Sequence, residues 1–211
     1  MFLRSLGEFR RIENNYQGDF LEGSIANIDP LDDQAMDQFC PINKSVRKYI
    51  MGGVSLLSED LKNDKLFCMY GIELKGGHLL KDEPDPRILD FGDTMVIITD
   101  FKSFMDRVRN ALSKCEKLHS FSRMDFGRVK YYNREKFFGA LNAFHKTDIY
   151  QWQNEYRFLF KDMSVCNSHY ILNIGDIRDI TITVPTKTFL SGIDIDWMSF
   201  KSFLFENLLW K

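Results

Sequence analysis

Gln153 and Glu155 are the residues whose types and spacing offer the clearest chemistry in this chain. They fall within 150–162, a stretch whose pattern predicts a core strand. Residues two apart in a strand project from the same face. A carboxylate held in a water-poor site stabilises positive charge that develops in a transition state, and an amide beside it can align an attacking group. We therefore expect Glu155 to act as an electrostatic catalyst and Gln153 to align the reacting group.

Three motifs follow one another along the chain: Arg4 near its start, Ser120-Phe121-Ser122 in the middle, and Gln153-Asn154-Glu155 later. This order resembles the arginine, serine and Gln-x-Glu arrangement of the mono-ADP-ribosyltransferase fold. The resemblance implies NAD as cofactor, with Arg4 on its phosphates and Ser120 or Ser122 orienting the nicotinamide ribose and the glutamate. Glu155 would bond a ribose hydroxyl as nicotinamide leaves. The serine motif departs from the Ser-Thr-Ser that is usual in the family.

A second resemblance rests on polar residues in two distant segments. The first segment carries Phe9, Arg10, Glu13, Gly18, Asp19, Glu22 and Gly23, and the second carries Lys146, Tyr150, Gln153, Glu155, Tyr156 and Arg157. Both segments look like an uncharacterised family of bacterial and phage-associated proteins with relatives in phage-defence or toxin systems. This resemblance implies a single polar cluster made of Arg10, Glu13, Asp19, Glu22, Glu155 and Arg157. In it we expect Arg157 as a partner of Glu155 or as a phosphate contact, and Arg10 as a second phosphate contact.

Two other interpretations compete for these residues. Glu155 can be a strand residue that pairs across the sheet, or with Arg157 on its own face. Glu73-Leu74-Lys75, at the end of a mostly apolar stretch, resembles the E-x-K end of the restriction-endonuclease-like core. In that core carboxylates hold Mg²⁺ and the lysine supports the attacking water. The alternative function is therefore a Mg²⁺-dependent nuclease, although no matching upstream aspartate is evident.

A third interpretation is a non-catalytic module that binds protein or nucleic acid. Basic residues are interleaved with aromatic ones between 123 and 136: Arg123, Arg128, Lys130, Arg134 and Lys136 alternate with Phe126, Tyr131 and Tyr132. Cations bind phosphates and aromatic rings stack on bases, so this combination suits a nucleic acid. Asp125 and Glu135 dilute the positive charge, which leaves a solvated face of mixed charge as the other interpretation.

Composition limits the classes of protein to which the chain can belong. Lys and Arg (28) nearly balance Asp and Glu (30), so no overall charge favours nucleic acid or an acidic membrane. No apolar run approaches the roughly 20 residues of a membrane span, and we expect a cytoplasmic protein. The four cysteines and four histidines are scattered without metal-ligand spacing, so we expect no metal site.

The pattern of elements predicts an α+β fold, with a mixed, mostly antiparallel sheet and packed helices in a single domain of 1–211. An acidic, proline-rich loop at 81–86 separates two halves. We expect helices over 5–12, from 29 to before 40, over 100–112, over 134–144 and from 196, and strands over 24–28, 66–74, 95–99, 127–132, 150–162, 170–174 and 180–184. The last helix is apolar on more than one face, which suggests a homodimer formed through it.

Overall fold

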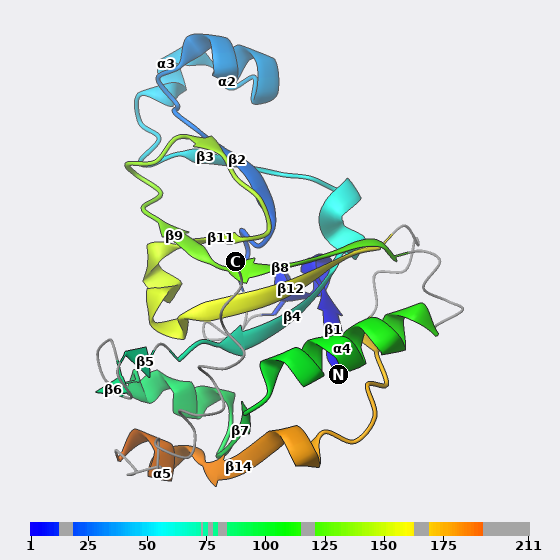
Figure 1. Ribbon diagram of the computed structural model, residues 1–211. Helices are drawn as coiled ribbons and strands as arrows, with labels where there is room; N and C mark the ends of the chain where they lie inside the picture. Colours follow the sequence, from blue (N-terminus) through cyan, green and yellow to red (C-terminus); the bar gives the residue numbers. More distant parts are fainter. Residues whose placement is uncertain are drawn as a thin grey trace. The chain divides into compact units, whose positions relative to one another are not determined.

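The structure, a computed structural model, describes residues 1–12, 19–72, 74–75, 78–79, 84–114, 121–162 and 169–191, with the backbone alone at 74–75, 78–79, 121–123 and 162 (Figure 1). The fold is α+β, and its sheets are mostly antiparallel, as expected. The chain forms two compact units. The large unit comprises Phe2–Tyr70 and Ser120–Tyr170, and the small unit comprises Met1, Gly71–His119 and Ile171–Lys211. The single domain remains a prediction.

The main sheet of the large unit has the strand order β13-β1-β4-β12-β8. Its strands are β1 (Phe2–Ser5), β4 (Lys65–Tyr70), β8 (Phe121–Arg128), β12 (Glu155–Asp162) and β13 (Tyr170–Ile171). β12 pairs antiparallel with β4 on one side and with β8 on the other. The strand that we expected to be central is therefore an interior strand, and β8 is left at one edge.

The start of β12 corrects the sequence prediction. Asp148–Gln153 form a 3-10 helix (η4), and the strand begins only at Glu155. Between them Asn154 adopts a left-handed backbone with φ of 37°, a conformation that asparagine tolerates better than most residues. Gln153 and Glu155 therefore do not share a strand face, and any meeting of their side chains must come from tertiary structure.

A second sheet of the large unit has the order β10-β2-β3, made of β2 (Ser24–Ile28), β3 (Val54–Leu57) and β10 (Gly139–Ala140). The helix expected over 134–144 is wrong, because this segment turns and supplies β10. Asn27 explains the difference: its buried amide donates to the carbonyl oxygens of Arg134 (3.0 Å) and Phe137 (2.7 Å). Such bonds from a distant strand satisfy backbone groups that a helix would have paired internally.

The rest of the large unit joins these sheets. β9 (Lys130–Tyr132) continues from β8 and pairs in parallel with β11 (His145–Thr147). The first helix is α1 (Leu6–Phe9), which is shorter than the helix expected over 5–12, and Ser5 and Glu8 form a capping box at its start. Helices α2 (Asp33–Phe39) and α3 (Lys44–Arg47) lie between β2 and β3, and η1 (Asp60–Asn63) precedes β4. α2 begins later than expected, because Asp32 caps it while Asp29 caps the turn before it.

The small unit contains the segment that the sequence predicts best. β7 (Thr94–Ile98) pairs with β14 (Thr181–Pro185), and between them in sequence lies α4 (Phe101–Ser113). Asp100 caps α4, and Phe104 and Val108 are buried, as their helical spacing predicts. The unit also holds β5 (Leu74–Lys75), β6 (His78–Leu79), η2 (Pro86–Phe91), η5 (Arg178–Ile180) and α5 (Thr186–Leu190).

Three further expectations differ from the structure or fall outside it. The apolar strand predicted over 66–74 ends at Tyr70, and the strand predicted over 170–174 ends at Ile171. Part of the 81–86 loop and the whole C-terminal helix expected from 196 lie outside the described residues. Across the described ranges, no helix has both the length and the apolar character to cross a membrane.

The cap of α4 allows a test of the fold. Asp100 Oδ1 accepts the backbone N–H of Ser103 at 2.8 Å, one of the donors that a helix start leaves unpaired. We expect Asp100→Ala to lower the free energy of unfolding in urea by about 1 kcal/mol. Asp106→Ala, within the same helix, is the matched control and should cost less than about 0.5 kcal/mol. Equal effects of the two variants would contradict the cap.

Candidate functional site

The centre of the candidate site is the guanidinium of Arg157, which is completely buried in the large unit. Nη1 and Nη2 donate to the two carboxylate oxygens of Glu22 at 2.7 and 2.8 Å. Nε and Nη2 donate to Glu155 at 2.6 and 3.3 Å, and Nη1 also donates to the carbonyl oxygen of Ala143. These five bonds match the five N–H donors of an arginine. Arg157 thus joins three segments that are distant in sequence.

Lys146 supplies the second buried cation of the cluster. Its Nζ lies 2.8 Å from Oε1 of Gln153, 3.3 Å from Oε2 of Glu155 and 3.9 Å from a carboxylate oxygen of Glu22. The same Nζ lies 4.6 Å from the ring centroid of Tyr150, within the range of a cation–π interaction. Lys146 therefore brings Gln153 and Glu155 together, although the two residues do not belong to the same strand.

The sequence positions these side chains through local structure. The turn at 19–23 places Glu22, and Gly23 completes it with φ of 69°, a left-handed conformation that favours glycine. The Nε of Arg10 donates to the carbonyl oxygen of Glu22 at 2.7 Å, which holds the turn against α1. At the other end of the cluster, the backbone N–H of Glu155 donates to the hydroxyl of Tyr131 at 2.9 Å.

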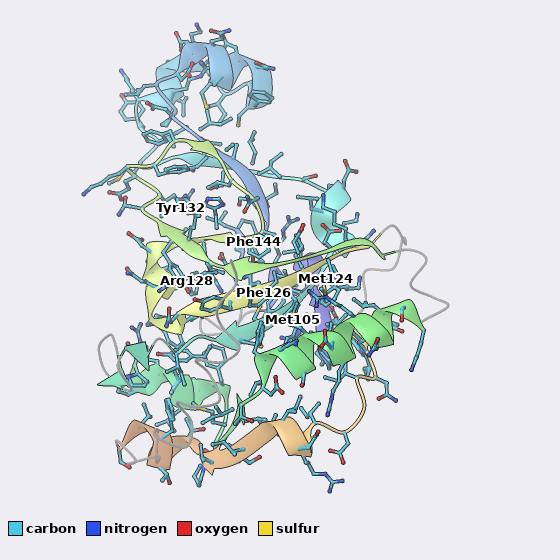
Figure 2. The ribbon with its side chains drawn as sticks, in the orientation of Figure 1. Met105, Met124, Phe126, Arg128, Tyr132 and Phe144 are labelled. Carbon is cyan, nitrogen blue, oxygen red and sulfur yellow. The ribbon has the colours of Figure 1, made fainter. Side chains whose placement is uncertain are left out.

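Phe144 covers the sheet beside the cluster. A Cβ placed on Gly127 would lie 3.4 Å from the Phe144 ring, at ordinary van der Waals distance, so the ring lies directly over this position of β8. Gly127 pairs with Arg157 in the neighbouring strand. Figure 2 labels Phe144 together with Tyr132 of β9 and Arg128 of β8, all in the large unit. An apolar ring over the sheet helps to keep water from the buried charges.

The electrostatics of the cluster hold Glu155 ionised. Burial alone would raise its pKa, but the positive charges of Arg157 and Lys146 outweigh burial and lower the pKa to about 2. Burial likewise opposes the charge of Lys146, yet Glu155 and Glu22 raise its pKa. The site therefore combines a carboxylate and an amine that are both charged near neutral pH.

Asp19 is the exception in this cluster. Burial, and then the negative charge of Glu22, raise its pKa to about 6, although its Oδ1 accepts the backbone N–H of Leu21 at 2.9 Å. A carboxyl group with this pKa exchanges its proton near neutral pH, which is the property required of a general acid or base. Asp19 and Glu155 thus have pKa values on opposite sides of that of an ordinary carboxyl group.

The structure brings together most of the polar cluster implied by the family resemblance. Asp19, Glu22, Glu155 and Arg157 interact electrostatically, and Arg10 holds the turn that carries Glu22. Glu13 lies outside the described residues. Glu155 pairs with Arg157 as one interpretation expected, but both are buried. Sequence reasoning placed neither Lys146 nor Tyr131 in this cluster: Lys146 was noted only in the family-like run, and Tyr131 only among the aromatic residues of the basic segment.

The structure does not bring Arg4 or Ser122 to Glu155. The Arg4 guanidinium lies over the rings of Phe2 and Phe9, at 5.6 and 5.5 Å. Arg4 pairs with Leu66 of β4, and Leu66 pairs with Leu159 of β12. Leu159 lies about 13 Å along β12 from Glu155. Ser122 lies at the far end of β8, at the register of 161–162, about 20 Å away along the strand. Ser120 is outside the described residues.

The residues of the two alternative functions are only partly described. Glu73 lies outside the described residues, and Lys75 and Arg123 are described in backbone alone. Arg134 donates to the carbonyl oxygen of Gly53 at 3.1 Å, which directs it toward the second sheet of the large unit. Arg128 and Lys130 are exposed on β8 and β9. The basic segment therefore divides: Arg134 contacts the segment before β3, whereas Arg128 and Lys130 are exposed at the end of β8 and the start of β9.

Comparison of the chain with protein-family models, with curated proteins and with solved structures found no match. In the part of the chain that the structure describes, no three His, Cys, Asp or Glu side chains are grouped so that they could hold a metal ion. Cys40 and Cys68 are free thiols, and the other two cysteines lie outside the described residues. The chemistry of the site is therefore argued from the geometry of its own side chains.

The first prediction from the cluster concerns Arg157. Replacing it with methionine keeps much of the volume but leaves Glu22 and Glu155 buried without their main cation, so we expect the free energy of unfolding to fall by about 3 to 5 kcal/mol. Arg178→Met is the matched control, because Arg178 pairs with Asp176 on the exposed surface. The control should unfold in urea almost as the original protein does. A similar, small effect of both variants would contradict a central role for Arg157.

The second prediction uses the pKa of Asp19. Because folding raises this pKa from 3.8 to about 6, the group favours the folded state below pH 3.8, and this contribution is lost as the pH rises through about 6. We expect Asp19→Asn to gain stability relative to the original protein between pH 4 and pH 7, by up to about 3 kcal/mol. Urea unfolding at both pH values measures the difference. Asp93→Asn, on an exposed residue of the small unit, controls for the substitution itself, and a pH-independent difference for Asp19→Asn would refute the prediction.

Proposed function

We propose that this protein is an NAD-handling transferase or glycohydrolase whose site is built on Glu155. The observation that carries the proposal is the buried cluster in which Arg157 and Lys146 hold the Glu155 carboxylate at 2.6 and 3.3 Å, with Asp19 in the same electrostatic network. The two cations lower the pKa of Glu155 to about 2, whereas burial and Glu22 raise that of Asp19 to about 6. Two carboxyl groups that differ in this way commonly divide the work of breaking a glycosidic bond.

The reaction requires the charge that Glu155 supplies. When the bond between the ribose C1′ and the nicotinamide nitrogen breaks, the electron pair leaves with nicotinamide and positive charge develops on the ribose. A carboxylate that is already ionised and oriented stabilises this charge without reorganising. Arg157 and Lys146 give Glu155 that orientation, and Gln153 reaches the same Lys146 Nζ from the end of η4.

Asp19 completes the proposed chemistry as the general base. In a hydrolase, the oxygen of a water molecule bonds to C1′ and its proton passes to the Asp19 carboxylate; in a transferase, a nucleophilic group of the target takes the place of water. Nicotinamide leaves as a neutral molecule and needs no proton. Arg157 acts as a positioning residue, because it is completely buried and all its donors are used within the protein. Arg10 is partly exposed, and its Nη atoms make only long bonds of 3.5 Å to the carbonyl oxygens of Gly23 and Ser58, so it is the cation we propose for the phosphates.

The assignment differs from the mono-ADP-ribosyltransferase arrangement in its partners. Glu155 and Gln153 keep the roles that the resemblance implies. Arg10 takes the phosphate-binding role of Arg4, and Lys146 with Arg157 orients Glu155 in place of Ser120 and Ser122. The general base Asp19 has no equivalent in the resemblance. A cytoplasmic setting and a function in a toxin or phage-defence system rest on the composition and on the family-like segments of the sequence.

The test is the release of nicotinamide from NAD by the purified protein, or the transfer of labelled ADP-ribose to a macromolecule. We expect Glu155→Gln to lower the rate by about 100-fold or more, as the loss of one electrostatic group does in other enzymes. Val108→Ala removes buried apolar atoms from α4 in the small unit and serves as a destabilised control that keeps its activity. If the original protein releases no nicotinamide, or if Glu155→Gln releases it equally fast, the proposal is wrong and the cluster is structural.

A further inference from the structure

We propose that the hydroxyl of Tyr131 selects ribose over deoxyribose at this site, by donating to the 2′-hydroxyl of the substrate while it holds the backbone of Glu155. This inference rests on the proposed function, since it concerns the ribose whose bond to nicotinamide is broken. It assigns a substrate contact to a residue outside the charged cluster.

The hydroxyl of Tyr131 fixes the backbone where β12 begins. Its oxygen accepts the backbone N–H of Glu155 at 2.9 Å, while the carbonyl oxygen of Glu155 accepts the backbone N–H of Val129 at 2.9 Å. In a regular antiparallel ladder the two paired residues exchange both backbone bonds, so the oxygen of Val129 would take the N–H of Glu155. Here a side chain takes the place of that backbone oxygen. The position of Glu155 therefore depends on one tyrosine hydroxyl.

The register of β9 and β11 places Tyr131 on the same side as the main amine of the cluster. The two strands are parallel, and Tyr131 is the register partner of Lys146. Register partners in a sheet project from the same face. The Nζ of Lys146 lies 3.3 Å from Oε2 of Glu155, and the hydroxyl of Tyr131 lies 2.9 Å from its backbone nitrogen. The strand pair thus holds Glu155 at two points, the carboxylate and the backbone.

Tyr131 keeps a hydrogen-bond donor for a ligand. A tyrosine hydroxyl both donates one proton and accepts through its lone pairs, and the bond from Glu155 uses a lone pair. Among the residues that the structure describes, no atom accepts the proton of Tyr131. Burial raises the pKa of this hydroxyl above its usual value, so the proton is retained at neutral pH. The side chain is also partly exposed, as a group that contacts a ligand must be.

The place and chemistry of this donor match a ribose hydroxyl. The proposed reaction puts the ribose C1′ beside Glu155, and the 2′-hydroxyl is carried by the carbon next to C1′. A neutral donor suits a neutral oxygen, whereas the phosphates of NAD are bound more strongly by a cation such as Arg10. A site that bonds a substrate hydroxyl discriminates against the analogue that lacks it. Tyr131 therefore predicts a substrate that contains ribose at the bond to nicotinamide.

A comparison of two substrates tests this contact. Tyr131→Phe removes the hydroxyl and keeps the ring, and nicotinamide release is measured with NAD and with the analogue that lacks the 2′-hydroxyl of the nicotinamide ribose. For each substrate, kcat/KM of the variant is divided by that of the original protein, which cancels the intrinsic reactivity of the substrate. We expect the loss to be about 10-fold greater with NAD than with the analogue, the effect of one hydrogen bond.

The bond to the backbone of Glu155 is tested without substrate. Hydrogen exchange of the Glu155 amide, followed by NMR, should become faster in Tyr131→Phe, because the amide loses its acceptor. Tyr156→Phe is the matched control. Tyr156 follows Glu155 in β12, so its side chain projects from the opposite face, and the substitution removes the same atom. It should change neither the exchange nor the substrate preference. Circular dichroism verifies that both variants are folded.

The outcomes separate this contact from the proposed function. If the original protein releases no nicotinamide from NAD, the proposed function is wrong and the contact falls with it. If the protein is active but Tyr131→Phe loses the same factor with both substrates, the function stands and the contact with the 2′-hydroxyl is wrong. An unchanged exchange rate of the Glu155 amide in Tyr131→Phe, or equal effects of Tyr131→Phe and Tyr156→Phe, would also overturn it.

Discussion

The buried guanidinium of Arg157 is the interaction on which the large unit depends. A buried charge is tolerated only when its partners are in place, and each unpaired donor would cost free energy. Arg157 therefore requires Glu22 from the turn before β2, Glu155 from its own strand and the carbonyl oxygen of Ala143 from the segment before β11. Each of these segments must adopt its observed position for the charge to be satisfied, so one residue makes their arrangement mutually dependent.

The same network defines what the site can do. Arg157 and Lys146, which keep Glu155 ionised, also bond to its carboxylate oxygens. A nucleophilic carboxylate would need an oxygen without such a bond, so Glu155 must act electrostatically. Asp19 lies in the same electrostatic environment but responds to it in the opposite direction, because burial and the neighbouring Glu22 outweigh the effect of the cations. A buried charge cluster can serve stability alone, and what distinguishes this one is a carboxyl group that titrates near neutral pH beside another that does not.

Local signals in the sequence predicted several elements well. Ser5 with Glu8, and Asp100 before α4, mark helix starts because their side chains pair with nearby backbone N–H groups. These local signals gave wrong predictions where a residue distant in sequence forms hydrogen bonds with the backbone. Asn27 binds the carbonyl oxygens of 134 and 137, so the helical spacing of that segment forms no helix. Before β12, the 3-10 helix η4 stands where a strand was expected. It ends at Asn154, whose backbone is left-handed, and the strand begins only after this residue.

The sequence by itself determined the α+β class, the presence of a core strand within 150–162 and the identity of most charged residues in the cluster, whereas the start of that strand at Glu155 came from the structure. Tertiary structure alone decided which of them meet: Glu22 and Arg157 are separated by 135 positions, and Lys146 reaches both Gln153 and Glu155 only because β11 lies where it does. It also separated Arg4 and Ser122 from Glu155. The physical reason is that caps and strand alternation act over a few residues, whereas the pairing of buried charges depends on strand register and on turns far apart in the chain.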